Sequence, residues 1–531
     1  MTTVSGFGRY FRFIVRRERI ISSMWIVIMV LFTTGVAAMY PGLFAGTEEI
    51  MAMAEMLRSP AMVGMMGPVY GLEGLNTAIL FSETMSCWMM IAIAVMNIFF
   101  INRHTRVDEE LGRLEMLRAL PIGRLAGAKS AMMGAFVLNF VIALLTAVSI
   151  IAVNVDGTTT IGAFAYAFTI SVIGFLFAAV TLLMAQLFST SRGSAGGAFL
   201  ILGILYVLRA LGDVSENILS YISPMGLGLR TFAFFENNFQ YIGIIFAESL
   251  VISWLAYLIC TKRDMGQGVF SARKGKANAS RFLKSPFGLA WRLTRNGVLV
   301  WCLAIFICGA LYGSFLGDIE SFVSKNDMYR QLVEAGYGVT ASMTENFIAL
   351  LYCIISLLSA VPIINLANKI HNEEKHGRLE PVLARSVGRV KMFVCYIVIA
   401  AVESAAVLFC GAMGLYLASA NTGLVSFETL LKAAMVYLPA LWVMMGISVL
   451  LVGILPKLTV LNWVVYAYSF AAVYFGRLFD MPEWSIKITP FGNVPQLPVQ
   501  EFNLIPLIVL TLIAVVLTAG GIIAFSRRDI E

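Results

Sequence analysis

Charged residues are scarce in this chain of 531 residues. Asp, Glu, Lys and Arg make up 13% of the sequence, hydrophobic residues make up 59%, and the mean hydropathy is +0.84. A soluble domain usually carries about 25% charged residues, and a chain this long cannot cover a water-facing surface with so few. Lipid must therefore be the solvent over much of its area.

Cysteine and histidine are too few and too scattered to build a disulfide framework or a metal centre. The seven cysteines contain no Cys-x-x-Cys pair and most lie inside apolar runs, where cysteine behaves as a small hydrophobe. The three histidines follow such runs in charged segments. The net charge of +7 is not gathered into a basic stripe with interleaved aromatic residues. We therefore expect neither a metal site nor a nucleic-acid partner.

Long apolar runs are what the sequence does contain. A membrane-spanning helix needs about 20 mostly apolar residues. The runs near that length are residues 20–40, 78–100, 128–153, 161–188, 195–211, 241–260, 298–316, 347–366, 392–417, 430–455, 459–475 and 504–525. The first is too long for the apolar core of a signal peptide, so we expect it to be retained. The sequence predicts an all-α polytopic membrane protein with about twelve transmembrane helices.

Basic residues gather at three places beside these runs. Five arginines lie within residues 9–19, nine Lys and Arg residues lie within residues 261–295, and Arg527 and Arg528 are close to the C-terminal end. Loops rich in Lys and Arg stay on the cytoplasmic side of a membrane. With an even number of spans, both termini and the central segment are expected there. The acidic loops 41–77 and 317–346 are then external, either as short surface helices or as loosely ordered loops.

The two halves of the chain carry the same charged pattern at a constant separation. The first copy is Glu109, Gly112, Arg113 and Glu115, and the second is Glu374, Gly377, Arg378 and Glu380, 265 positions later (377 − 112 = 265). The motif Lys262-Arg263-Asp264 recurs as Arg527-Arg528-Asp529 at the same separation. We interpret the chain as a tandem duplication that forms two parallel six-helix repeats.

This duplication predicts three parts. Residues 1–265 form the first six-span transmembrane half, and residues 266–296 form a basic cytoplasmic linker leading into the second half. Residues 297–531 form the second six-span half.

Acids and arginines alternate at helical spacing in the repeated segment. Such a pattern is typical of a short helix in the membrane–water interface. We expect Leu114 and Leu117 to face the bilayer or neighbouring helices, while Glu109, Arg113 and Glu115 face water or a partner protein. A plain solvated loop is the alternative, but membrane topology requires positive charge and not repeated glutamates in register.

The pattern Glu-x-x-Gly-Arg-x-Glu, followed by a small residue and Gly-Arg, resembles the cytoplasmic coupling segment of type-2 ATP-binding-cassette (ABC) exporter permeases. The duplicated form resembles bacterial permeases for polyketide antibiotics and tetracycline-type drugs, and the resemblance covers essentially the whole chain. It implies that both segments dock on an ATPase through the eight residues given above. Since Pro121 is matched by Ser386, and Met116 by Pro381, equal coupling from both halves does not follow.

The resemblance also implies a motor on another polypeptide. The sequence has no Gly-x-x-x-x-Gly-Lys-[Ser/Thr] loop, so ATP and Mg would be bound by two copies of a partner ATPase and no cofactor by this chain. The chain itself is then a permease and not an enzyme. Its expected location is the bacterial plasma membrane, and its expected substrate is a small amphipathic or lipophilic compound moved out of the cytoplasm or inner leaflet.

Four acids in or beside the apolar runs are candidates for the substrate path. Glu403 and Glu248 lie within spans, and Glu83 and Glu345 precede the second and eighth spans. Ionisable residues inside a membrane are costly and usually functional. Each of the four acids either contacts substrate, takes part in gating, or pairs with an arginine inside the bundle.

A proton-coupled secondary transporter with twelve spans is the alternative class. That superfamily also carries a loop with Gly and Arg after its second span, but its usual pattern is Gly-x-x-x-Asp-Arg-x-Gly-Arg-Arg. Here, acids precede Gly112 and Gly377 and no such basic run follows. Transport that persists without an ATPase would favour this class. A membrane sensor or lipid scaffold, a third class, would move no substrate.

Overall fold

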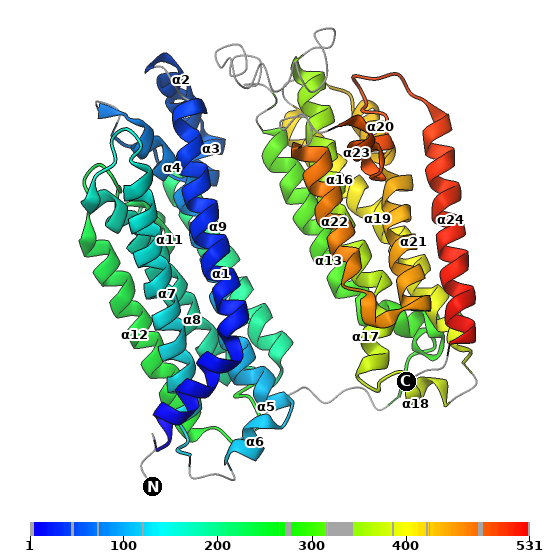
Figure 1. Cartoon of the computed structure of the whole chain (residues 1–531), viewed down its shortest axis with the longest axis horizontal. Helices are drawn as coiled ribbons and strands as arrows, with labels where there is room; N and C mark the ends of the chain where they lie inside the picture. Colours follow the sequence, from blue (N-terminus) through cyan, green and yellow to red (C-terminus); the bar gives the residue numbers. More distant parts are fainter. Residues whose placement is uncertain are drawn as a thin grey trace. The chain divides into compact units, whose positions relative to one another are not determined.

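The computed structural model describes residues 5–528 except 44–46, 72–73, 119–121, 265, 271–277, 315, 317–342, 385–386, 421–422, 424 and 476–481. The chain divides into two compact units, Met1–Gly275 and Lys276–Glu531, and each is a bundle of long helices (Figure 1). The described residues contain no β-strand. The predicted all-α polytopic fold is confirmed.

The first unit is built from six long helices. They are α1 (Phe7–Leu43), α4 (Thr77–Asn102), α7 (Ala126–Val153), α8 (Thr160–Leu187), α9 (Ser191–Val214) and α12 (Phe239–Lys262). Helix α1 packs along α7, α4 packs along α8, and α8 contacts both α9 and α12. The side chains of Asn76, Thr159 and Thr190 cap the N-termini of α4, α8 and α9 by accepting a backbone N–H three residues further on.

Helix α8 is the buried centre of the first unit. In its most apolar stretch 89% of the residues are buried, compared with 17% in α1 and 22% in α12. Beside it, Asn97 of α4 and Asn139 of α7 exchange two side-chain hydrogen bonds of 3.0 and 2.8 Å. A Cβ atom at Gly174 of α8 would lie 2.4 Å from Asn139 Oδ1. Only glycine therefore lets α8 approach this polar pair so closely.

The second unit repeats the plan of the first. Its long helices are α13 (Pro286–Gly313), α16 (Met343–Ala367), α19 (Arg389–Ser419) and α24 (Leu504–Arg527), and α20 (Phe427–Met435) and α21 (Leu438–Ile454) together form one further span. Helix α13 packs along α19, and α21 packs along α24. Helices α12 and α24 are 265 positions apart at both ends (504 − 239 = 265 and 527 − 262 = 265). The separation read from the charged motif therefore also holds for helix boundaries.

Eleven of the predicted spans are, in the part of the chain that the structure describes, helices long and apolar enough to cross a membrane. The exception is the run 459–475. Among the described residues it forms α22 (Leu461–Phe470) and a π-helical turn (Ala471–Phe475), which together contain fewer than the roughly 20 residues that a bilayer requires. Helix α13 begins at Pro286, so Arg292 and Arg295 lie on a helix although they were expected in the linker.

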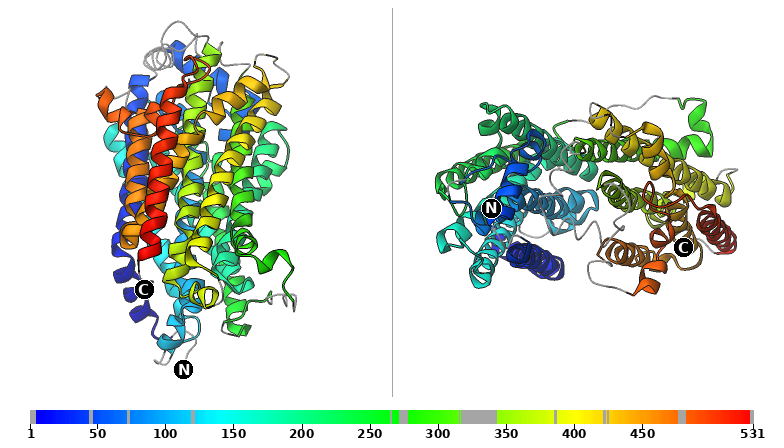
Figure 2. Two further views of the ribbon diagram at one scale, coloured as in Figure 1. Left: turned by 90° about the vertical axis from the view of Figure 1, so that its right-hand side faces the viewer. Right: turned by 90° about the horizontal axis from the view of Figure 1, so that it is seen from above.

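Short helices lie at both ends of the long ones. In the first unit α2 (Thr47–Leu57) and α3 (Pro60–Met66) lie at the end opposite to α5 (Asp108–Glu110) and α6 (Arg113–Arg118), as Figures 1 and 2 show. Of the two alternatives for the loop between the first two spans, the structure shows the short helices. Their expected counterparts in 317–346 lie almost entirely outside the described residues.

Candidate functional site

The repeated charged segment follows the second long helix of each unit. In the first unit α4 continues through a π-helical turn (Arg103–Val107) into α5, and in the second unit α16 is followed by α17 (Lys369–Lys375) and α18 (Glu380–Leu383). Gly112 and Gly377 end these helices with φ angles of 67° and 64°. A Cβ at either glycine would meet no atom within 4 Å. The left-handed backbone, and not crowding, therefore requires glycine there.

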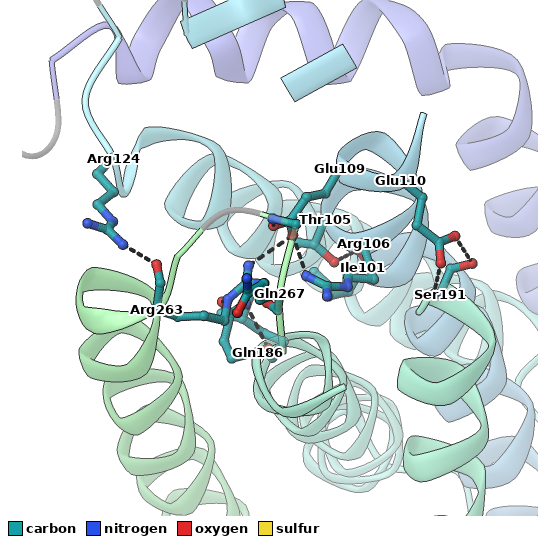
Figure 3. A network of polar contacts seen from close by, with 12 residues as sticks. Ile101, Thr105, Arg106, Glu109, Glu110, Arg124, Gln186, Ser191, Arg263 and Gln267 are labelled. Carbon is teal, nitrogen blue, oxygen red and sulfur yellow. Dashed lines mark hydrogen bonds and ion pairs between the residues drawn. The ribbon is translucent and has the colours of Figure 1, made fainter. Parts of the chain in front are cut away.

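Glu109 lies at the centre of a polar cluster (Figure 3). Its Oε2 atom accepts hydrogen bonds from Arg106 Nη1 at 2.7 Å and from Arg263 Nη2 at 2.9 Å. Its Oε1 atom accepts the backbone N–H of Gly266 at 2.7 Å. Arg263 Nε also donates to Gln186 Oε1 of α8 at 3.2 Å. Glu109 therefore joins the repeated segment to the C-terminal end of α12 and to the chain that follows it.

Glu374 makes the equivalent ion pair in the second unit. Its two carboxylate oxygens lie 2.7 and 2.6 Å from Nη2 of Arg528, which directly follows α24. His371 Nδ1 lies 3.8 Å from the same carboxylate. The glutamates and the arginines both recur at the separation of the motif (374 − 109 = 265 and 528 − 263 = 265). The same ion pair is therefore built twice.

A further arginine binds the main chain at the same place. Arg124 donates to two carbonyl oxygens at the end of α12, one of them that of Arg263. Arg389 donates to the carbonyl oxygens of Ser526 and Arg528, the latter at 2.6 Å. The last carbonyls of a helix have no intrahelical partner, and arginine can satisfy them. We call each set of three residues a helix clamp: Glu109, Arg263 and Arg124 in the first unit, and Glu374, Arg528 and Arg389 in the second.

The acid before each clamp glutamate binds the arginine that follows the glycine. Asp108 Oδ1 lies 3.3 Å from Arg113 Nη1, and Glu373 Oε2 lies 2.7 Å from Arg378 Nε. Asp108 Oδ2 also accepts a hydrogen bond from Arg17 of α1 at 2.8 Å. The first segment is thereby tied to α1 as well as to α12.

Charged residues beyond the glycine of each segment are exposed. The side chains of Arg113 and Arg378 are about half exposed, and those of Glu115 and Glu380 are exposed too. The surface beyond each glycine therefore carries charges of both signs.

The clamp glutamates are not part of that surface. The Glu109 side chain is 8% exposed and that of Glu374 is 5% exposed. The prediction that Glu109 faces water or a partner is therefore wrong, because two arginines draw its carboxylate inward. Leu114 lies beside Gly127 of α7, as expected for a residue that faces neighbouring helices, and the side chain of Leu117 lies outside the described part of the chain.

Sequence reasoning missed the arginine partners of the clamp. Arg263 and Arg528 were interpreted as orientation signals and as part of a repeated motif, and the repeated Gly-Arg pairs that contain Arg124 and Arg389 were interpreted only as a repeat. The signal was nevertheless available, because all four recur at the separation that relates the two glutamates.

Two of the substrate-path candidates lie well inside long helices. Glu403 of α19 is 3% exposed, and its Oε2 atom is buried without a hydrogen-bond partner among the described residues. Glu248 of α12 is half-buried and lines an apolar groove of about 650 Å³.

The other two candidates lie in the first two turns of helices and do not precede them. Glu83 lies in the second turn of α4, where its Oε1 atom accepts the backbone N–H of Tyr70 at 2.6 Å. The Tyr70 hydroxyl donates to Ser82 Oγ at 2.9 Å, and burial, with Glu83 nearby, raises the pKa of Tyr70 well above its usual range. Glu345 lies in the first turn of α16. The four candidate acids therefore belong to four different helices.

A buried charge that sequence reasoning did not single out lies in α9. Arg209 is fully buried and donates to the backbone carbonyls of Gly64 and Met65 at 2.8 and 3.2 Å. Its Nη1 atom lies 3.4 Å from Asp213 Oδ2. Arg209 therefore fixes the C-terminal turn of α3 against α9.

Known proteins share this sequence over nearly its full length. A family model described as "Multidrug efflux system permease Rv1217c, C-terminal domain" matches residues 283–526. The chain is 30% identical over 532 residues to the multidrug efflux system permease protein Rv1217c of Mycobacterium tuberculosis, and this match covers 98% of the chain and 94% of that protein. It includes both units and both repeated segments. The chain is a multi-pass membrane protein that belongs to the family of multidrug efflux system permeases represented by Rv1217c.

Proposed function

We propose that this chain is the transmembrane permease subunit of an ATP-driven exporter of the type-2 ABC class. It moves amphipathic or lipophilic, drug-like compounds out of the cytoplasm or inner leaflet across a bacterial plasma membrane. Two copies of a separate ATPase, which bind ATP and Mg, dock on the two repeated segments at the cytoplasmic face. Both chain termini lie on that face. The efflux named for the related permease supports the transport role.

The helix clamp is the observation that carries this proposal. Each repeated segment contains a glutamate that is bound to the end of the last helix of its unit. Breaking a buried ion pair leaves an uncompensated charge, at a cost of about 3–5 kcal/mol. A partner that displaces the segment therefore displaces the end of α12 or α24 with it. A coupling element must transmit motion in this way.

The charges beyond each glycine suit a protein partner. Arg113 and Glu115, and their counterparts Arg378 and Glu380, offer both signs of charge on a short exposed stretch. Complementary charges of this kind specify a partner and its register more than they add raw affinity. The sequence has no phosphate-binding loop of its own.

Purification of the chain from its native membrane in mild detergent tests the proposal. The wild type should copurify with an ATPase subunit, and Glu115→Ala/Glu380→Ala should weaken that association while the thermal unfolding of the permease stays unchanged. Glu483→Ala in α23 (Glu483–Lys487) is the matched control, because this glutamate is 85% exposed and lies outside both segments. If no ATPase copurifies with the wild type, the ATP-driven mechanism is rejected.

A proton-coupled transporter remains the second candidate because of Glu403. A buried carboxylate with a partnerless oxygen is suited to carry a proton. Uptake of a drug into inverted vesicles separates the two mechanisms. Transport that requires ATP and survives an uncoupler supports the exporter, whereas transport that requires only a proton gradient and is lost in Glu403→Gln supports the alternative.

A further inference from the structure

We propose that the first unit holds a binding site for hydrophobic organic cations in the groove between α8, α9 and α12, with Glu248 as the counter-ion. The inference rests on the proposed export function for its physiological role. Binding itself requires only this chain.

The groove has the size and lining of a small-molecule site. Its volume of about 650 Å³ lies within the roughly 300–1,000 Å³ of ligand pockets. Val180 of α8, Leu205 of α9 and Val251 of α12 line its walls, and Pro224 of α11 (Pro224–Leu229) also lines it. Eleven of the twelve lining residues are apolar, and the other is Glu248. The groove therefore pairs a large apolar surface with a single acid.

Glu248 lies at a depth where water is scarce. It is the tenth residue of α12, which places it about 14 Å along the helix axis at 1.5 Å per residue. A bilayer has a hydrocarbon core of about 30 Å, so Glu248 lies near its middle. Its carboxylate makes no hydrogen bond or ion pair with any residue that the structure describes. An ionisable residue in such a position points to a ligand or ion path.

The second repeat shows that the bundle does not need this acid. Helix α24 corresponds to α12 at a separation of 265, so Ile513 is the counterpart of Glu248 (513 − 248 = 265). The equivalent helix therefore forms with isoleucine at this position. A structural role common to both units does not explain the glutamate.

Charge complementarity selects the occupant of the groove. In a medium of low dielectric constant, a cation gains most from an opposite charge that has no other partner. The apolar walls favour a ligand whose charge is surrounded by aromatic or aliphatic groups. A hydrophobic cation meets both conditions, whereas a neutral compound of the same shape uses only the walls.

Equilibrium binding to the purified full-length chain in lipid discs tests the site. Radiolabelled tetraphenylphosphonium is the cationic probe, triphenylphosphine oxide is the neutral comparator, and empty discs give the background from the lipid. The wild type should bind the cation saturably. Glu248→Gln should weaken that binding by about tenfold or more, as expected for loss of a counter-ion in a low-dielectric site, and leave the neutral comparator unchanged.

Further variants separate the counter-ion from folding and from groove shape. Glu248→Ile installs the residue of the second repeat and should lose the cation in the same way. Leu205→Trp fills the groove and should weaken both probes, while the exposed control Glu483→Gln should alter neither. Cation binding by Glu248→Gln equal to that of the wild type overturns the proposal. The proposal is also overturned if bound tetraphenylphosphonium is displaced by an ethanolamine-headgroup lipid and not by a phosphatidylglycerol lipid. The occupant of the groove is then a lipid.

The results also separate this site from the motor. If cation binding depends on Glu248 but no ATPase copurifies, the binding site is supported and the ATP-driven mechanism is refuted. A chain that copurifies with an ATPase but binds the cation independently of Glu248 refutes the site alone.

Discussion

Arg528 Nη2 lies 2.6 Å from Glu374 Oε2, although the two residues are 154 positions apart in the sequence. The same separation of 154 joins Arg263 to Glu109 in the first unit. In each unit the end of the last long helix is thus bound to the segment that follows the second long helix. A displacement of either segment should therefore also displace the end of the helix that is bound to it.

Exchanging the charges of Glu374 and Arg528 should restore the stability that either single substitution removes. Glu374→Arg or Arg528→Glu alone leaves two like charges together at a buried position, and each should lower the free energy of unfolding by about 3–5 kcal/mol. The double variant should recover much of that loss. Thermal unfolding of the purified chain measures stability, and drug-stimulated ATPase activity of the reconstituted complex measures coupling.

An exposed ion pair provides the matched control for this exchange. Glu428 and Lys432 are 75% and 68% exposed and lie one helical turn apart in α20. Reversing both of them should change stability by less than about 1 kcal/mol. If the Glu374/Arg528 double variant is no more stable than either single variant, the pair does not hold the segment as described.

Alanine at Gly112 should destabilise the first segment although nothing crowds it. An L-residue in the left-handed region costs about 1–2 kcal/mol, and Gly377→Ala should cost a similar amount. Gly203→Ala is the control, because Gly203 lies inside α9, where an added Cβ would meet no atom within 4 Å, and alanine there should gain up to about 1 kcal/mol of helix propensity. Thermal unfolding of the three variants checks the order, and equal effects at Gly112 and Gly203 would contradict it.

The hydrogen-bonded pair between α4 and α7 should behave as a unit. Asn139→Leu leaves the buried amide of Asn97 without its partner, at a cost of about 1–3 kcal/mol. Replacing both residues by leucine removes both polar groups, so the double variant should cost less than the sum of the two single variants. A double-mutant cycle on unfolding free energies measures this coupling, and simple additivity would refute it.

Removal of Arg209 should release α3 without unfolding the bundle. Arg209→Met keeps an unbranched apolar stem but leaves the carbonyls of Gly64 and Met65 without their donor. Backbone amides of α3 should then exchange with solvent deuterium faster, while those of α8 stay protected. Arg58→Met is the control, because Arg58 is 51% exposed and pairs with Glu55, three residues away in the sequence. Unchanged exchange in α3 would show that other contacts hold it.

The membrane-spanning helices were predictable because each carries its own signal in length and composition. The run 161–188 corresponds to α8, Thr160–Leu187, within one residue at either end. The run 459–475 corresponds to α22 and the π-helical turn over residues 461–475, and an apolar composition does not reveal this change of helix type. Helix boundaries depend on such local departures, which hydropathy does not report.

The candidate site was predictable only in part. The repeat singled out Glu109 and Glu374, but it assigned them to the surface because charged residues beside a span normally face water. Their burial depends on the second and the last long helix of each unit ending close together, and a separation of 154 residues gives no local sign of this. Glu248 was recognised as an intramembrane acid, but its groove is lined by residues of five separate helices, and no local sequence pattern brings these helices together.

The difference between Glu248 and Ile513 has a consequence for how a protein with two fused repeats can evolve. Two identical subunits of a homodimer receive every mutation twice, so a residue that suits one side is imposed on the other. Covalent fusion of the two repeats removes that restriction, because each copy is encoded separately. One repeat can then acquire a side chain that selects a ligand, while the other repeat keeps an apolar side chain at the same position. Both repeats retain the same ion pair between the repeated segment and the last helix.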